Sequence, residues 1–210
     1  MKSTKEKLLN TAEQLFAKHG LDGVSTRDLA GKAKVNLCAI TYYFGSKQKL
    51  YEAVIEEIVS FISDNFVKMV LPTANQSSPF LSPRDKIKNL IRLFFSFICS
   101  EKISGNRAEL LIREILNPSP AYVRFYETIM EPIHKHLSAL IAQDTGLPET
   151  NFRTVLLSHT LFGQTIMFRI HKEALLRRLN LKKYTPELTA EIQKLLLCNC
   201  DAILDGAREN

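Results

Sequence analysis

Several marks of a secreted, membrane-bound or disordered protein are missing from this 210-residue sequence. It has only 4 cysteines, irregularly spaced and without a CxxC pair, so no disulfide framework is expected. No apolar stretch reaches about 18 residues, and the first six residues lack the apolar core of a secretory signal. Only 8 Gly and 8 Pro are spread through an aliphatic-rich chain, which argues against disorder. These absences predict a folded protein of the reducing cytoplasm.

The charge of the chain is concentrated near its start. The net charge is +6, and residues 1–50 hold nine basic and four acidic residues, a net +5. The remaining residues, 51–210, are therefore nearly neutral. A basic segment joined to a nearly neutral body indicates a module that faces a polyanion. A solvated basic face without a partner is the alternative, and charge alone does not decide between them.

Helical spacing of apolar residues dominates the sequence, and no run alternates with period two, so the predicted fold class is all-α. Ser3 with Glu6 and Ser25 with Asp28 form capping-box patterns, and Gly20 is a typical residue for a helix end. The pattern predicts about nine helices, over residues 3–20, 25–33, 36–44, 47–70, 84–100, 107–116, 120–145, 150–172 and 187–206. Residues 72–83 are predicted to form a Pro/Ser-rich loop, and Pro132 a kink.

Two short helices within the basic segment have the pattern of a helix-turn-helix. Ile40 and Phe44, four residues apart, are predicted to be the buried stripe of the second helix. The opposite stripe is free of long acidic side chains, so a close approach to the major groove of DNA is unobstructed; its members are Asn36, Cys38, Ala39, Thr41 and Tyr42. Lys47 opens the next helix, where its ammonium and the helix N-terminus are expected to bind a phosphate.

Several short motifs resemble the DNA-binding domain of TetR-type repressors: TRDLA at 26–30, VN at 35–36 and ITYYFGSK at 40–47. The stretch from 36 to 47 is most similar to the CecR-like subgroup, as are RE at 113–114 and PSPAY at 118–122 further along. The resemblance implies an N-terminal three-helix DNA-binding domain over residues 1–48. It also implies a C-terminal helical domain over 49–210 for ligand binding and dimerisation.

The resemblance also implies a role for each residue of the motif. The residues expected to contact DNA phosphates are Thr26, Arg27, Thr41, Tyr42, Tyr43 and Lys47, with Arg27 in reach of a base. Those expected to face base edges in the major groove are Asn36, Leu37, Cys38 and Ala39. Three other roles compete with these: Leu37 or Tyr43 as packing residues, and Cys38 as a thiol switch.

Two residues depart from the pattern of most relatives. Thr41 stands where they have tyrosine, so a phosphate contact there would be shorter or lost. Lys34 stands at a turn position where they have glycine. A lysine in left-handed conformation costs on the order of 1 kcal/mol, unless the turn differs.

Two late helices carry wide apolar faces, and the resemblance implies that such proteins bind DNA as homodimers. Two helices from each of two chains would form a four-helix interface with two-fold symmetry. The residues predicted to form it are Phe152, Leu156, Gly163, Ile166, Ile170, Ile192, Leu195, Leu196 and Ile203. The alternative is that both helices pack wholly within one chain.

The middle of the chain is predicted to bind a small apolar or amphipathic effector. Aromatic and methionine side chains at helical spacing often form ordinary core, but here polar residues accompany them on the same helices, and a buried polar group needs a partner. The predicted ligand-binding residues are Phe94, Phe97, Ile98, Arg113, Glu114, Tyr122, Phe125, Met130, His134, His159, Phe162 and Met167. No cofactor is expected. No metal is expected either, because the HxH pair of His134 and His136 on one helix points to different faces.

The sequence therefore predicts a ligand-responsive transcriptional regulator, a repressor that a small effector releases from a pseudo-palindromic DNA operator. The alternative is an all-α enzyme or small-molecule carrier that uses the C-terminal cavity. A membrane-surface binder is disfavoured, because the helix-turn-helix offers the apolar side of the first helix a packing partner. The operator bases, the effector and the sign of the regulation stay open.

Overall fold

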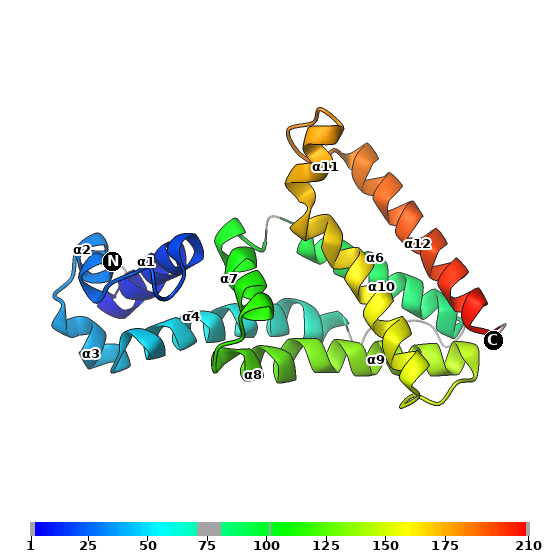
Figure 1. Cartoon of the computed structure of the whole chain (residues 1–210), viewed down its shortest axis with the longest axis horizontal. Helices are drawn as coiled ribbons and strands as arrows, with labels where there is room; N and C mark the ends of the chain where they lie inside the picture. The colour runs from blue at the N-terminus through cyan, green and yellow to red at the C-terminus, as the bar shows by residue number, and fades with distance from the viewer. Residues whose placement is uncertain (1–2, 71–80, 101, 209–210) are drawn as a thin grey trace. The chain divides into compact units, whose positions relative to one another are not determined.

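A computed structural model of the chain describes residues 3–70, 81–100 and 102–208. Every regular element within these residues is a helix, which confirms the all-α prediction (Figure 1). The chain divides into two compact units, one of residues 1–63 with 103–129 and one of 64–102 with 130–210. The first unit therefore takes a middle segment of the chain as well as the N-terminal region. None of the helices in the described ranges is long and apolar enough to cross a membrane.

The first unit is built around the N-terminal helices. Its elements are α1 (Thr4–His19), α2 (Thr26–Ala33), α3 (Cys38–Phe44), α4 (Lys47–Ile62), α7 (Gly105–Leu116) and α8 (Ala121–Phe125). Helix α1 contacts α2, α4 and α7, and α8 packs on α4. The side chains of Phe16, Leu29 and Leu50 are fully buried where these helices meet.

Side-chain caps fix the helix starts that the sequence predicts. Ser3 and Ser25 each accept a hydrogen bond from the backbone amide of the third residue of their helix, and the carboxylates of Glu6 and Asp28 each accept one from the backbone amide of the capping serine. Both predicted capping boxes are therefore present. Gly20 ends α1 with a φ of 72°, a conformation that glycine adopts without a steric penalty.

The second unit is formed by the later helices. Its elements are α6 (Pro83–Ile98), α9 (Glu131–Thr145), α10 (Phe152–Ile170), α11 (Lys172–Arg178) and α12 (Pro186–Arg208). Helix α6 contacts α9, α10 and α12. An ion-pair cluster ties three of them together, because the guanidinium of Arg84 on α6 lies 3.0 Å from the carboxylate of Asp144 on α9 and also pairs with Asp205 on α12.

Three predicted helices differ in detail from the structure. The helix from Lys47 is interrupted by a π-helical turn, η1 (Ser63–Val67). Another π-helical turn, η2 (Tyr126–Met130), lies just before Pro132, where a kink was expected, and separates α8 from α9. The short helix α11 was not predicted, since the predicted helix before it ended at residue 172. Most of the predicted loop at 72–83 lies outside the described residues.

A buried carboxylate stabilises the first unit. The side chain of Glu114 on α7 is almost fully buried, and its Oε1 accepts a 2.6 Å hydrogen bond from the Tyr51 hydroxyl on α4. Its Oε2 accepts from the Ser119 hydroxyl at 2.9 Å and from the Ser119 amide at 3.3 Å. Three donors thus offset the desolvation of one carboxylate.

We expect the variant Tyr51→Phe to lower the free energy of unfolding by about 1–3 kcal/mol, because it leaves the buried carboxylate short of a donor without removing ring volume. Urea unfolding of the variant and the wild type measures the difference. Tyr42→Phe, which removes an exposed hydroxyl, is the matched control and should unfold like the wild type. Equal stability of Tyr51→Phe would show that the hydrogen bond contributes nothing.

Candidate nucleic-acid interface

The turn between α2 and α3 is closed by backbone hydrogen bonds around Lys34. The Lys34 amide donates to the carbonyl of Gly31 at 3.2 Å, and the Val35 amide donates to the carbonyl of Ala30 at 3.0 Å. This pair of bonds is the Schellman motif, which requires a left-handed residue after the helix. Lys34 fills that position with φ 54° and ψ 50°. The expected left-handed lysine is therefore present.

Helix α3 is oriented by its two buried side chains. Ile40 is 1% exposed and Phe44 is also buried, and the helix contacts α1 and α4. Asn36 caps its start, since its Oδ1 accepts a 2.9 Å hydrogen bond from the amide of Cys38. Gly45, with φ 81°, ends the helix. The predicted buried stripe is confirmed.

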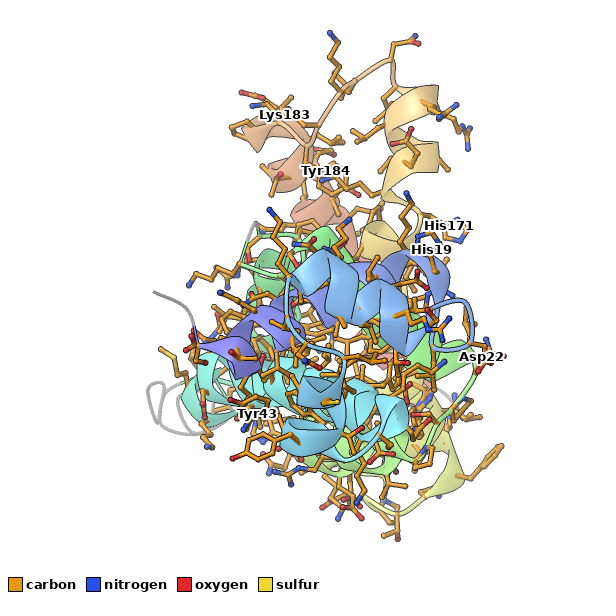
Figure 2. All side chains as sticks on the ribbon, turned by 90° about the vertical axis from the view of Figure 1, so that its left-hand side faces the viewer. His19, Asp22, Tyr43, His171, Lys183 and Tyr184 are labelled. Carbon is orange, nitrogen blue, oxygen red and sulfur yellow. The ribbon has the colours of Figure 1, made fainter. Side chains whose placement is uncertain are left out.

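The outer face of α3 is open to solvent. Tyr42 is 82% exposed, and its ring meets that of Tyr43 edge to face, with centroids 4.9 Å apart. Figure 2 shows the Tyr43 side chain projecting away from the ribbon. Leu37 is also exposed, which removes the competing role of that residue as core. The predicted DNA-facing residues that are exposed are Arg27, Asn36, Leu37, Cys38, Thr41, Tyr42 and Tyr43, while Thr26 and Ala39 are half-buried.

A groove of about 450 Å³ lies beside this outer face, between α3 and the start of α1. Its lining includes five predicted DNA-binding residues: Asn36, Cys38, Ala39, Tyr42 and Tyr43. It also includes Thr4, Lys7 and Lys34, none of which is among the residues predicted to bind DNA. In the sequence, Lys34 is only a cationic residue at a turn, and Thr4 and Lys7 are only polar residues in the first turn of a helix. Many solvent-exposed faces carry such residues.

Lys47 is placed differently from the prediction. Its ammonium donates to the backbone carbonyls of Leu21 at 2.8 Å and Val24 at 2.9 Å. It therefore fastens the loop before α2 to the start of α4 instead of pointing to a free phosphate position. The N-terminus of α4, capped by Ser46, still offers backbone amides.

The residues predicted for the dimer interface separate into three groups by exposure. Phe152, Leu156, Ile170 and Leu195 are exposed large apolar side chains on α10 and α12. Gly163, Ile166 and Ile203 are half-buried. For Ile192 and Leu196 the prediction is wrong, because they are 4% and 1% exposed in a single chain, on α12, which packs on α6. They belong to the core of the second unit.

The predicted ligand-binding residues fall in different units. Arg113, Glu114, Tyr122 and Phe125 belong to the first unit. The Arg113 guanidinium donates to the carbonyl of Ala17 on α1 at 3.2 Å, and Tyr122 meets the ring of Phe125 at 6.1 Å. The argument that Glu114 is a buried polar group in need of a ligand is wrong, since Tyr51 and Ser119 satisfy it.

The other predicted ligand-binding residues belong to the second unit, where an aromatic cluster joins three helices. Phe94 on α6 stacks on Phe162 of α10 with centroids 4.3 Å apart. His134 on α9 stacks on His159 of α10 at 4.5 Å and lies 4.8 Å from Phe162. Ile98 is buried in this unit, Phe97, Met130 and His134 are half-buried, and His159 and Met167 are exposed.

Three polar atoms in this unit are buried without a partner among the described residues: Nε2 of His134, Nε2 of His136 and Nε2 of Gln164. Nδ1 of His134 lies 2.9 Å from the Ser158 hydroxyl. Burial, and to a lesser extent the neighbouring His159, lowers the pKa of His134 to about 4. Its imidazole is therefore neutral at pH 7, with one nitrogen left to bind a polar group.

We expect stability to depend on pH through His134. Its pKa is about 6.5 in the unfolded chain and lower in the folded protein, so its contribution is complete above pH 6.5 and is lost as the pH falls toward 4. Between pH 7.5 and 4.5, urea unfolding should show that the free energy of unfolding falls less steeply with decreasing pH for His134→Gln than for the wild type. The difference between the two slopes should correspond to at most about one bound proton. His19→Gln, at an exposed histidine of the first unit, is the control. Parallel curves for His134→Gln and the wild type would contradict the expectation.

Among the described residues, no three side chains of His, Cys, Asp or Glu gather in a way that suits a metal ion.

Comparison with known proteins agrees with this geometry. Residues 8–54 match the family model "Bacterial regulatory proteins, tetR family", and residues 83–207 match that of the C-terminal domain of the HTH-type transcriptional dual regulator CecR. The chain is 32% identical to CecR of Shigella flexneri over 209 residues, 96% of this chain and 92% of that protein. It is 26% identical to the probable HTH-type transcriptional regulator YttP of Bacillus subtilis over 75% of this chain and 71% of that one.

Solved structures share the fold. A TetR-like transcriptional regulator from Rhodococcus superposes with a TM-score of 0.64 at 19% identity, covering 95% of this chain and 96% of that chain. The ketosteroid transcriptional regulator KstR2 of Mycobacterium tuberculosis superposes with a TM-score of 0.60 at 16% identity, covering 98% and 95%.

Proposed function

Because the chain belongs to the TetR family of bacterial regulatory proteins, we propose that this DNA-binding transcriptional regulator reads a pseudo-palindromic operator as a homodimer. In a two-fold dimer, two copies of α3 would enter major grooves whose centres lie about 34–36 Å apart along the duplex. The base-reading residues would be Asn36, Leu37, Cys38 and Ala39. Arg27, Tyr42 and Tyr43 would bind phosphates on either side.

One observation carries the proposal: α3 hides Ile40 and Phe44 and leaves its other side open. A helix whose outer side were covered by the protein itself would be ordinary core. Here the outer side carries short polar residues and two tyrosine hydroxyls, which suit hydrogen bonding to base edges and phosphates. The net charge of +5 over residues 1–50 adds sequence-independent attraction to the duplex.

The effector would be a small, largely apolar molecule bound in the second unit. The aromatic cluster of Phe94, Phe162 and His134 supplies apolar surface, and the unpartnered Nε2 atoms of His134 and Gln164 would orient a polar group of the effector. Binding that favours a state unable to bind DNA would release the operator. To move the ratio of the non-binding state to the DNA-binding state from 1:99 to 99:1, the effector must bind the non-binding state more tightly by about 5.5 kcal/mol.

Repression is the sign of regulation that we propose. Two of the matching relatives, NicS of Pseudomonas putida and KstR2 of Mycolicibacterium smegmatis, are named repressors. CecR of Shigella flexneri is named a dual regulator, so activation at some promoters is the alternative. A reporter gene placed behind the bound operator, with and without the regulator, distinguishes the two signs.

Selection of duplexes from a random 30-base-pair library, followed by footprinting, tests DNA binding. We expect an enriched pair of inverted half-sites one helical turn apart, bound with an affinity that falls steeply between 50 and 200 mM salt. Failure to enrich any sequence, or binding that is independent of salt, would overturn the proposal.

A further inference from the structure

Lys34 occupies a backbone conformation that does not suit lysine. Its φ of 54° and ψ of 50° are left-handed, and the β-carbon of a residue other than glycine is crowded there. The Schellman bonds of this turn involve only the backbone, so glycine would form them equally well. The turn itself therefore gives no reason for a lysine side chain.

The Lys34 side chain also makes no contribution to the fold that would offset this strain. It is exposed, and it forms no hydrogen bond or ion pair with any residue that the structure describes. The contrast with Lys47 is direct, because the ammonium of Lys47 is held by two backbone carbonyls. A folding role therefore accounts for Lys47 but not for Lys34.

The position of Lys34 indicates what it serves. Its side chain lines the groove of about 450 Å³ beside α3, and Lys7 and Thr4 line the same groove from α1. No acidic residue is among the residues that line it in the described part of the chain, and the remaining members include Asn36, Ala39 and Tyr42 of the DNA-facing surface. A cationic rim beside a helix that enters the major groove is where a backbone phosphate would lie.

We propose that Lys34 is a DNA-contacting residue, whose ammonium binds a backbone phosphate at the rim of this groove, and that the strained turn is retained for that contact. The inference rests on the proposed DNA binding and adds a residue to it. Lysine suits the task, because its compact ammonium on a flexible stem binds a phosphate without a fixed geometry. The contact would add affinity for any sequence and leave base reading to α3.

Replacing Lys34 by glycine should move stability and DNA affinity in opposite directions. The melting temperature of Lys34→Gly should rise by about 2–4 °C, because the strain is removed. Its affinity for a fluorescein-labelled duplex, selected with the wild-type protein, should fall about tenfold or more at 0.1 M salt. The slope of log affinity against log salt should become shallower by about 0.9 per contact, or about 1.8 for two subunits. A residue that served only the fold would not produce this pair of changes.

Three further variants make the result specific. Lys34→Asn keeps a side chain that tolerates the left-handed region but carries no charge, so it should lose affinity as Lys34→Gly does. Lys34→Arg should retain the wild-type salt slope. Lys18→Gln is the matched control, since Lys18 is an exposed lysine near the other end of α1, about 16 Å from Lys7 along the helix, and it should leave both affinity and slope unchanged.

The outcomes separate this inference from the proposed function. Wild-type protein that selects and binds a duplex, with Lys34→Gly and Lys34→Asn binding it at the same affinity and slope, would overturn the role of Lys34 and leave the function standing. Wild-type protein that enriches no duplex would overturn both.

Discussion

Replacing Ala39 by glutamate should abolish specific DNA binding and leave the fold intact. Ala39 is half-buried on α3 and lines the groove beside its outer face. A carboxylate there would meet the negative potential of the major groove and its phosphates, and opposed like charges cost several kcal/mol. We expect the affinity for the selected duplex to fall at least about a hundredfold, which corresponds to about 2.7 kcal/mol.

Ala39→Gln is the matched control for this variant. It adds nearly the same volume without the charge, so the ratio between the glutamine and glutamate variants isolates the electrostatic part of the loss. Circular dichroism and the melting temperature should match the wild type for both, since the core side of the helix, Ile40 and Phe44, is untouched. Equal affinities of Ala39→Glu and Ala39→Gln would mean that Ala39 does not approach DNA.

The helix-turn-helix could be predicted from sequence because its signals are local. The caps at Ser3 and Ser25 depend on residues three positions apart, and the orientation of α3 depends on Ile40 and Phe44, which are one turn apart. The left-handed Lys34, by contrast, was expected only from the resemblance, because most relatives have glycine at that turn position. Interactions within a few residues of the chain are fixed by the same geometry in most proteins.

Contacts between distant residues could not be predicted in this way. The ammonium of Lys47 reaches carbonyls more than twenty residues earlier, and the partners of Glu114 come from α4 and from the loop after α7. The sequence showed that these side chains are polar and stand near helix ends. It did not show which of their possible partners, protein or ligand, the tertiary fold would supply.

The wide apolar faces of α10 and α12 show a related limit. Periodicity indicates that a face is covered, but does not say whether the chain itself or a second copy covers it. In α12, Ile192 and Leu196 face the core of the unit, while Leu195 remains exposed. The structure therefore separates the apolar residues that the chain itself covers from those that stay exposed. On α10 an apolar stripe stays exposed and is available to a partner, and it includes Phe152, Leu156 and Ile170.

That stripe gives the second large expected effect. Leu156 lies on it and is 49% exposed in the single chain. In a two-fold interface the substitution Leu156→Glu would bury two carboxylates without partners, each at a cost of several kcal/mol. We expect sedimentation velocity to show a dimer for the wild type and a monomer for the variant at the same micromolar concentration.

Leu179→Glu is the matched control, because Leu179 is a leucine of the same unit with a similar exposure, 46%, outside the proposed interface. It should remain dimeric. The monomeric Leu156→Glu protein would present only one α3 to the operator, so its affinity for the full inverted repeat should fall to that for a single half-site. A Leu156→Glu protein that stays dimeric and binds the repeat normally would place the interface elsewhere. The apolar stripe would then need another partner, since large exposed apolar patches are uncommon on monomeric proteins.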